Sequence, residues 1–174
     1  MKKNVLITGE PGCGKTTLVE KVAAALGAQA GGFTTTEIRG ARGRVGFAIR
    51  TLDGKEGVLS HIDHKSPHRV GRYGVNIHDI DTIAVPAIQE AVRAGKIVII
   101  DEIAWMELFS NAFREAVLSA LNSRSRVLVT IQMRCDAILD GIRGRPDVTL
   151  ITLTRENRGQ LVNALTREFE EKLL

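Results

Sequence analysis

Four residues near the start of the chain have the types and the spacing needed to bind a nucleoside triphosphate. Gly9, Gly14, Lys15 and Thr16 fill the specified places of the pattern G-x-x-x-x-G-K-S/T. Glycines let backbone N–H groups approach phosphate oxygens, the lysine is a point charge for the β- and γ-phosphates, and the threonine hydroxyl is a ligand for Mg²⁺. We therefore predict a magnesium-dependent phosphate site whose nucleotide-binding residues are Gly9, Glu10, Pro11, Gly12, Cys13, Gly14, Lys15, Thr16 and Thr17.

An acidic pair follows a continuous apolar run later in the chain. Residues 97–100 are typical of a strand buried on both faces, and Asp101 and Glu102 come directly after them. A carboxylate at the end of such a strand can hold Mg²⁺ together with a phosphate-loop hydroxyl, so the predicted metal-binding residues are Thr16 and Asp101. The neighbouring carboxylate can face the γ-phosphate and take a proton from an attacking water. The predicted catalytic residues are therefore Glu102 and Lys15.

The acceptor of the phosphoryl group decides which reaction such a site performs. Glu102 favours water, so hydrolysis to a nucleoside diphosphate and phosphate is our leading hypothesis. A kinase acting on a nucleotide or another small molecule is the second hypothesis, and a nucleotide-switched binding module, with RNA as one partner, is the third. Gln132 either contacts the γ-phosphate or is an ordinary loop amide. The sequence does not choose among the candidates for a charge-stabilising arginine, which are Arg134, Arg143, Arg145 and Arg155.

A strand before the glycine loop and a helix after it must position these groups. Residues 5–7 form a short apolar run, and apolar residues recur at helical spacing from Leu18 to Leu26. The order of strand, glycine loop and helix is the context in which this motif binds phosphate.

The remaining segments predict an α/β fold. Residues 33–39 and 44–52 are expected to form a β-hairpin around the turn at 40–43. Alternation of strands and helices then favours a three-layer fold, a mainly parallel sheet with helices on both faces and the hairpin as an extension. Because there is no linker, repeat or low-complexity segment, residues 1–174 are predicted to form one domain. Further strands are expected at 58–59, 97–100, 127–131 and 148–153, and helices at 84–94, 108–121, 136–142 and 157–169.

Residues 60–81 show no regular pattern. Their histidines and aspartates include metal-ligand types, but the spacing matches no tight metal site. Residues 71–76, with paired glycines and the single tyrosine, look like a positioned functional loop. Aromatic residues that could stack on a base are few, and the candidates are Phe33, Tyr73 and Trp105.

The charge and the aromatic content of the chain indicate which classes of binding partner are favoured. The net charge of +4 suits a site for polyanionic nucleotides as well as it suits nucleic acid. Because aromatic residues make up 4% of the chain and no dense Lys/Arg run occurs, nucleic acid is the less favoured partner. We expect no membrane partner, since no apolar stretch is long enough to span a bilayer. The first strand begins directly after Met1-Lys2-Lys3, which leaves no room for a signal peptide, so we expect a cytoplasmic location. We also expect the protein to be a monomer.

Three segments together resemble a known family. Residues 9–18 (Gly-Glu-Pro-Gly-Cys-Gly-Lys-Thr-Thr-Leu), 70–76 (Val-Gly-Arg-Tyr-Gly-Val-Asn) and 101–110 (Asp-Glu-Ile-Ala-Trp-Met-Glu-Leu-Phe-Ser) are similar to the small nucleoside triphosphatases of the thermophilic type, also called cancer-related nucleoside triphosphatases. Thr-Arg-Glu-Asn-Arg at 154–158 fits as well, so the resemblance runs along nearly the whole chain.

This resemblance implies a P-loop NTPase fold with a RecA-like core, in which the strand before the phosphate loop does not neighbour the strand that ends in Asp-Glu. It also implies slow hydrolysis of ATP, GTP and other nucleoside triphosphates to diphosphates. One departure is visible, because the family usually has Gly-Lys where this chain has Ala104-Trp105. If that lysine assists phosphate binding or catalysis, the rate or the substrate choice of this protein differs.

Overall fold

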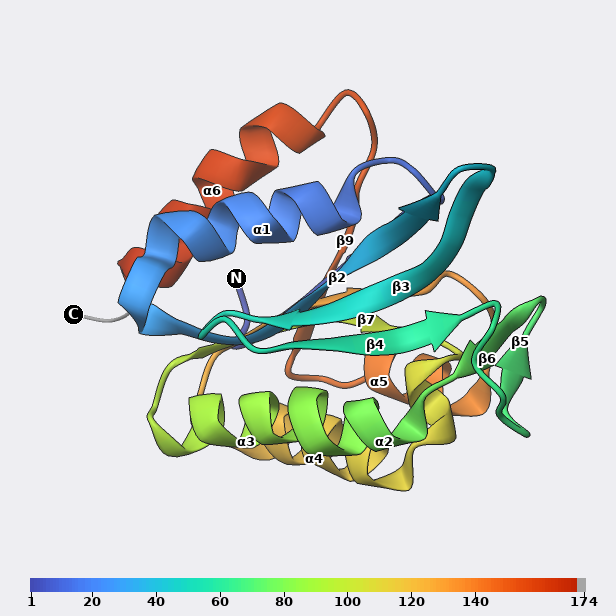
Figure 1. The fold of residues 1–174 in the computed structure, drawn as a ribbon. Coiled ribbons are helices and arrows are strands. Elements are labelled where there is room, and N and C mark those ends of the chain that lie inside the picture. Colours follow the sequence, from blue (N-terminus) through green and yellow to red (C-terminus); the bar gives the residue numbers. More distant parts are fainter. Residues whose placement is uncertain (172–174) are drawn as a thin grey trace.

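All the strands of this computed structural model, which describes residues 1–171, belong to one sheet. Its nine strands lie in the order β5-β6-β4-β3-β2-β7-β8-β1-β9, with helices on both faces (Figure 1). The predicted three-layer α/β architecture is therefore confirmed.

One half of the sheet is parallel and carries the phosphate loop. The strand pairs β2–β7, β7–β8, β8–β1 and β1–β9 all run in the same direction. Because β8 separates β1 from β7, the strand before the phosphate loop and the strand with Asp101 and Glu102 are not neighbours, as the RecA-like expectation requires. The parallel strands are β1 (Asn4–Thr8), β2 (Ala30–Gly40), β7 (Ile97–Ile103), β8 (Val127–Ile131) and β9 (Val148–Thr152).

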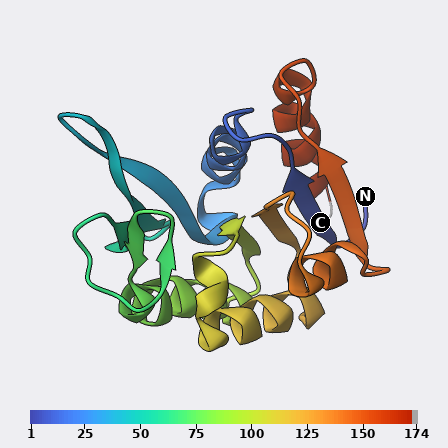
Figure 2. The same ribbon diagram turned by 90° about the vertical axis from the view of Figure 1, so that its right-hand side faces the viewer.

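The other half is an antiparallel extension. The predicted hairpin is present, because β2 continues past its contact with β7 and pairs with β3 as far as Gly40 and Gly43. Figure 2 shows this hairpin projecting away from the body of the protein. The prediction of an irregular segment at 60–81 is wrong in part, because two very short strands and a helical turn lie within it. The two short strands are β5 (Arg69–Val70) and β6 (Tyr73–Val75), and the helical turn is α2 (Ile77–Asp79). The longer strands of the extension are β3 (Gly43–Thr51) and β4 (Glu56–His61).

Two groups of helices cover the two faces of the sheet (Figure 1). On one face, α1 and α6 enclose an apolar core built around Val19, Val22 and Phe169. On the other face, α3, α4 and α5 enclose a larger core that includes Phe33 and Phe113. The helices are α1 (Lys15–Leu26), α3 (Val85–Arg93), α4 (Asn111–Asn122), α5 (Ala137–Arg143) and α6 (Arg158–Glu170). None of the helices within residues 1–171 has the length and apolarity needed to cross a membrane.

The start of α4 differs from the helix expected at 108–121. The side chain of Ser110 accepts a hydrogen bond from the Phe113 N–H at 2.9 Å, which caps the helix and fixes its start at Asn111. Residues Glu107–Phe109 form a separate 3₁₀ turn ahead of that cap. This turn brings Glu107 beneath the end of β7, where it becomes part of the site.

Candidate active site

The phosphate loop connects β1 to α1 in a conformation that requires glycine. Gly12 and Gly14 have φ angles of 76° and 104°, which side chains rarely adopt. A Cβ atom on Gly9 would lie 2.6 Å from the carbonyl oxygen of Leu153, so a larger residue does not fit there. The first turn of α1 contains no acidic residue, and its free N–H groups and positive dipole end are therefore available to an anion.

A cleft of about 630 Å³ lies over this loop. It is bounded by the loop, by Glu102, by residues 132–134 after β8, and by the inner part of the β2–β3 hairpin. Most of the predicted nucleotide-binding residues line the cleft, namely Gly9, Pro11, Gly12, Gly14, Lys15, Thr16 and Thr17. Two of them are placed differently, because the side chain of Cys13 belongs to the core beneath α1 and Glu10 is exposed to solvent.

Lys15 lies across the mouth of the loop. Its Nζ donates hydrogen bonds to the carbonyl oxygens of Gly9 at 3.0 Å and Glu10 at 3.4 Å. The same atom lies 3.8 Å from Oε1 of Glu102. The two predicted catalytic groups, which come from segments far apart in the sequence, therefore meet at the phosphate loop.

Asp101 is buried beneath the loop and held by threonine side chains. Thr130 Oγ1 donates to Asp101 Oδ1 at 2.6 Å, and the backbone N–H and hydroxyl of Thr35 lie 3.4 Å from Oδ2. Burial raises the pKa of Asp101, while hydrogen bonds from Thr130, Thr16 and Thr35 lower it. A cation near Thr16 would stabilise the charged carboxylate.

The oxygen donors of Thr16 and Asp101 fit Mg²⁺, which takes one or two protein ligands and completes its shell with phosphate oxygens and water. In the part of the chain that the structure describes, no group of three or more His, Cys, Asp or Glu side chains could hold a metal ion. A cation shared with the phosphates of a bound nucleotide suits this donor set better than a cage made by the protein alone.

Glu102 combines partial burial with a charged neighbourhood. Burial raises its pKa to about 7, the nearby Asp101 adds to that effect, and Lys15 opposes it. A carboxylate with a pKa near neutrality is well suited to accept a proton from water. The role of Glu102 as the base stays a prediction, and its place beside Lys15 is what makes that role testable.

A second buried carboxyl group, Glu107, was missed in the sequence reasoning. It is 3% exposed, and burial raises its pKa to about 8, with further upward effects from Glu102 and Asp101. Glu107 lies in the resembling segment 101–110, but only the turn before α4 shows that it points inward. The signal available in the sequence was a single acidic residue within an otherwise apolar run.

We expect Glu107→Gln to make the stability of the protein less dependent on pH. The folded protein keeps a proton on Glu107 that the unfolded chain releases above the usual pKa of 4.5, until the pH exceeds about 8. The free energy of unfolding therefore falls with rising pH in this window, by up to about 1.4 kcal/mol for each tenfold change in proton concentration. Urea denaturation from pH 5 to pH 8 measures this effect. Glu90→Gln, at an exposed position on α3, is the control, and parallel pH profiles of wild type and Glu107→Gln would contradict the prediction.

The structure separates the arginines that the sequence left equivalent. Arg134 lines the cleft, and its guanidinium carbon lies 4.4 Å from the centroid of the Trp105 ring. Arg143 instead donates to the carbonyl oxygens of Gln132 and Arg134, so it braces the loop that carries them. Trp105, which stands where the family usually has lysine, therefore packs against a different cationic side chain, that of Arg134.

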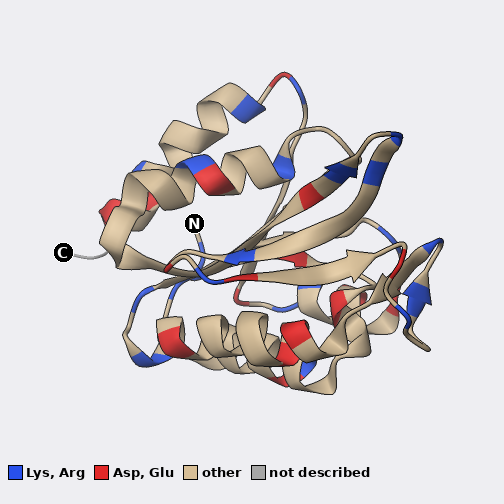
Figure 3. Ribbon diagram, viewed as in Figure 1, with Lys and Arg blue, Asp and Glu red and all other residues tan. Residues whose placement is uncertain are grey.

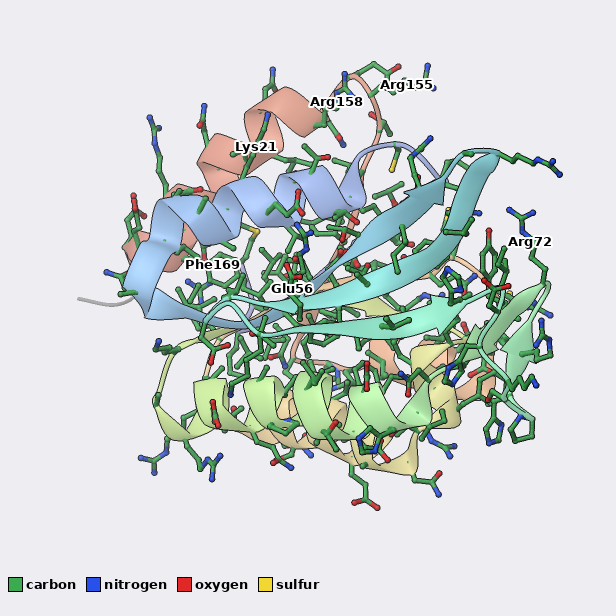
Figure 4. The ribbon with its side chains drawn as sticks, in the orientation of Figure 1. Lys21, Glu56, Arg72, Arg155, Arg158 and Phe169 are labelled. Atoms are coloured by element: carbon green, nitrogen blue, oxygen red, sulfur yellow. The ribbon has the colours of Figure 1, made fainter. Side chains whose placement is uncertain are left out.

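Of the other two arginines, Arg145 pairs with Asp147 and with the side chain of Asn122, outside the cleft. Arg155 is exposed in the segment before α6, where Figure 4 shows it pointing into solvent. Among the four candidates, the geometry thus favours Arg134.

Arg44 is a further cation at the cleft that sequence reasoning missed. It lines the cleft from β3, donates to Glu37 Oε1 at 3.0 Å and lies 4.8 Å from the centroid of the Phe47 ring. Figure 3 shows several Lys and Arg residues along the β2–β3 hairpin and in the β5–β6 turn. The segment at 71–76, expected to be a functional loop, contributes through Tyr73, whose hydroxyl accepts a hydrogen bond from Arg44 at 3.1 Å.

The strand order, the glycine loop and the paired carboxylates define a P-loop NTPase with a RecA-like core. The family model described as NTPase matches residues 4–166, and the chain belongs to this family of nucleoside triphosphatases. The resemblance seen in the sequence is thereby confirmed.

Individual relatives are similar to this protein in sequence and in structure over nearly the full chain. Nucleoside-triphosphatase THEP1 of Thermotoga maritima is 44% identical over 161 residues, which cover 92% of each chain. The crystal structure of THEP1 from Aquifex aeolicus has a TM-score of 0.89 and 40% identity, and covers 96% of this chain and 99% of that one. The solution structure of a human cancer-related nucleoside triphosphatase has a TM-score of 0.82 and 34% identity over 97% of each chain.

Proposed function

We propose that this protein hydrolyses ATP, GTP and other nucleoside triphosphates to the diphosphate and phosphate, with Mg²⁺ held by Thr16 and Asp101. The observation that carries the proposal is the meeting of Lys15 and Glu102, 3.8 Å apart, over the phosphate loop. Relatives that cover nearly the whole chain are named nucleoside triphosphatases, which supports water as the acceptor.

The residues of the site divide the work between binding and chemistry. The loop N–H groups and Lys15 bind the phosphates, while Glu102 orients a water molecule and accepts its proton as the water oxygen bonds to the γ-phosphorus. The bond from that phosphorus to the bridging oxygen breaks, and its electron pair stays on the diphosphate. Mg²⁺, when bound, neutralises charge on the β- and γ-phosphates. Arg134 and Arg44 are placed to stabilise the charge that develops on the transferred group.

Incubation of the purified protein with γ-labelled ATP or GTP separates the three hypotheses. Release of labelled phosphate with Mg²⁺, and its loss in EDTA, is the expected result. Labelled product formed only after an acceptor is added would instead indicate a kinase. Tight binding without turnover would indicate a nucleotide-switched binding module.

A groove between α1 and α6 is the best place for the nucleoside. This groove, about 530 Å³ in volume, shares Gly14 and Thr17 with the phosphate cleft. Its walls include the long, flexible side chains of Lys21 and Arg158, which come from α1 and from the start of α6 (Figure 4). Because these side chains are flexible, the groove provides few fixed hydrogen-bonding groups that could recognise the nucleobase.

We expect weak discrimination between ATP and GTP, by less than about 100-fold in kcat/KM, or about 2.7 kcal/mol. None of the three aromatic candidates lines the phosphate cleft or the groove between α1 and α6. Phe33 is buried against Phe113, with ring centroids 6.1 Å apart, while Tyr73 and Trp105 each lie against an arginine. Steady-state kinetics with both nucleotides measure the ratio, and a larger preference would mean that a base-reading group exists. The cytoplasmic location and the monomeric state stay predictions.

A further inference from the structure

A smaller cavity, here called the side pocket, opens beside Glu102. It has a volume of about 190 Å³ and is enclosed by Leu59, Val70 and residues 104–107. Glu102 and Gln132 line both the side pocket and the phosphate cleft. A molecule in the side pocket would therefore lie next to Glu102 and could reach the predicted γ-phosphate position from there.

Unpartnered polar atoms gather at this pocket. In residues 1–171, six buried side-chain oxygen or nitrogen atoms have no hydrogen-bond partner, and three of them belong to pocket residues: Trp105 Nε1, Glu107 Oε2 and Gln132 Oε1. Each such atom costs about 1–3 kcal/mol when it is left unsatisfied. The donor and the two oxygens belong to residues that line the same small space, and a ligand bound there would give them partners after small rotations of these side chains.

The walls indicate the chemistry of that ligand. Leu59, Val70 and Met106 supply apolar surface, and a cavity with apolar walls and a few polar groups is typical of a site for a small organic molecule. A single water molecule needs only about 10–15 Å³ of such volume. Because burial raises the pKa of Glu107 to about 8, its carboxyl group is mostly uncharged at pH 7 and suits a neutral partner. A neutral molecule that carries hydroxyl groups meets all these conditions.

We propose that the side pocket binds a small neutral alcohol or polyol and directs one hydroxyl group toward Glu102, so that the protein transfers the γ-phosphoryl group to this hydroxyl as well as to water. The proposal rests on the proposed hydrolysis, because both acceptors use the same phosphate site. The alcohol oxygen forms a bond to the γ-phosphorus, and the bond to the bridging oxygen breaks. The alcohol proton passes to the carboxylate that takes it from water in hydrolysis. The products are a phosphate ester and the nucleoside diphosphate.

The test is a competition between water and alcohol. The protein is incubated with γ-labelled ATP, Mg²⁺ and either ethylene glycol, glycerol or butane-1,4-diol, and labelled phosphate is separated from labelled ester. We expect the ratio of ester to phosphate to exceed the molar ratio of alcohol to water by at least about tenfold for one of these alcohols. If the ratio of ester to phosphate equals the molar ratio of alcohol to water for all three alcohols, the proposal is overturned while the proposed hydrolysis stands. Absence of both products would instead contradict the proposed function.

A matched pair of variants links the transfer to the side pocket. Val70→Phe fills the pocket and should lower the ratio of ester to phosphate toward the statistical value, whatever its effect on the total rate. Val92→Phe makes the same change at another half-buried valine packed on the same core, outside the cleft and the pocket, and should leave the ratio unchanged. An equal ratio in wild type and a folded Val70→Phe protein would overturn the proposal.

Trp105 supplies a readout that does not depend on activity. It is the chain's single tryptophan, and it lies in the pocket wall. Titration of the preferred alcohol should change its fluorescence saturably in wild type and in Val92→Phe, but not in Val70→Phe. A change that is linear in all three proteins would be a solvent effect and would count against binding.

Discussion

Glu102→Gln is expected to lower kcat by about 10²–10⁴-fold with little change in nucleotide affinity. Glutamine keeps the size and hydrogen bonding of the side chain but cannot accept the proton of the attacking water. Affinity for a non-hydrolysable triphosphate should hold or rise, because a negative charge near the γ-phosphate is removed. The measurement is kcat beside the dissociation constant of that analogue.

The pH dependence of the same variant tests the role of Glu102 independently. Since a base must be deprotonated to act, kcat/KM of the wild type should rise with pH and level off above the pKa of about 7. Glu102→Gln should lack this rise. If the rise came from ionisation of the nucleotide instead, it would persist in the variant. Asp101→Asn is the contrasting variant, because it should weaken magnesium dependence and nucleotide binding together. Wild-type turnover in folded Glu102→Gln would place the base elsewhere.

Lys15→Ala is expected to lower kcat/KM by about 10²–10³-fold, the usual effect of removing a donor that faces developing charge. In the described residues, the ammonium group is hydrogen bonded to two loop carbonyl oxygens and lies near Glu102, so its loss should leave the fold intact. Thr16→Ala should also cut turnover, through loss of a magnesium ligand.

Circular dichroism and thermal melting verify folding in these loop variants. Lys55→Ala, which removes an exposed ammonium group in the turn after β3, is the matched control and should keep wild-type kinetics. Wild-type turnover in folded Lys15→Ala protein would refute the assignment of the phosphate loop.

Regular elements were predictable because their signals are local. The strand at 127–131 and the apolar run at 97–100 are buried on both faces, so their residue types identify them without knowledge of their neighbours. The helix at 108–121 was placed three residues early, because Leu108 and Phe109 extend the apolar stripe while the Ser110 cap decides the start.

The outer parts of the site were not predictable, because they depend on contacts between distant segments. Arg44 reaches the cleft only after β2 has aligned the hairpin beside β7, and Arg134 is distinguished from Arg143 by its position in the cleft and over Trp105. Glu107 carries no periodic signal, and its burial follows from the turn that precedes α4. Residue types alone could identify the phosphate loop and the acidic pair, but not the groups that surround them.

The continuity of β2 affects the entropy of nucleotide binding. Its first part pairs with β7 and its second part with β3, and Thr35, near the start of the second part, is hydrogen bonded to Asp101. The backbone of this wall of the cleft is therefore preorganised before a nucleotide arrives. The conformational entropy lost on binding comes mainly from long side chains such as Arg44 and Arg134. Immobilising each one costs about 0.5–1.5 kcal/mol. Contacts already made with Glu37 and Trp105 reduce that loss, so more of the binding free energy is retained as affinity.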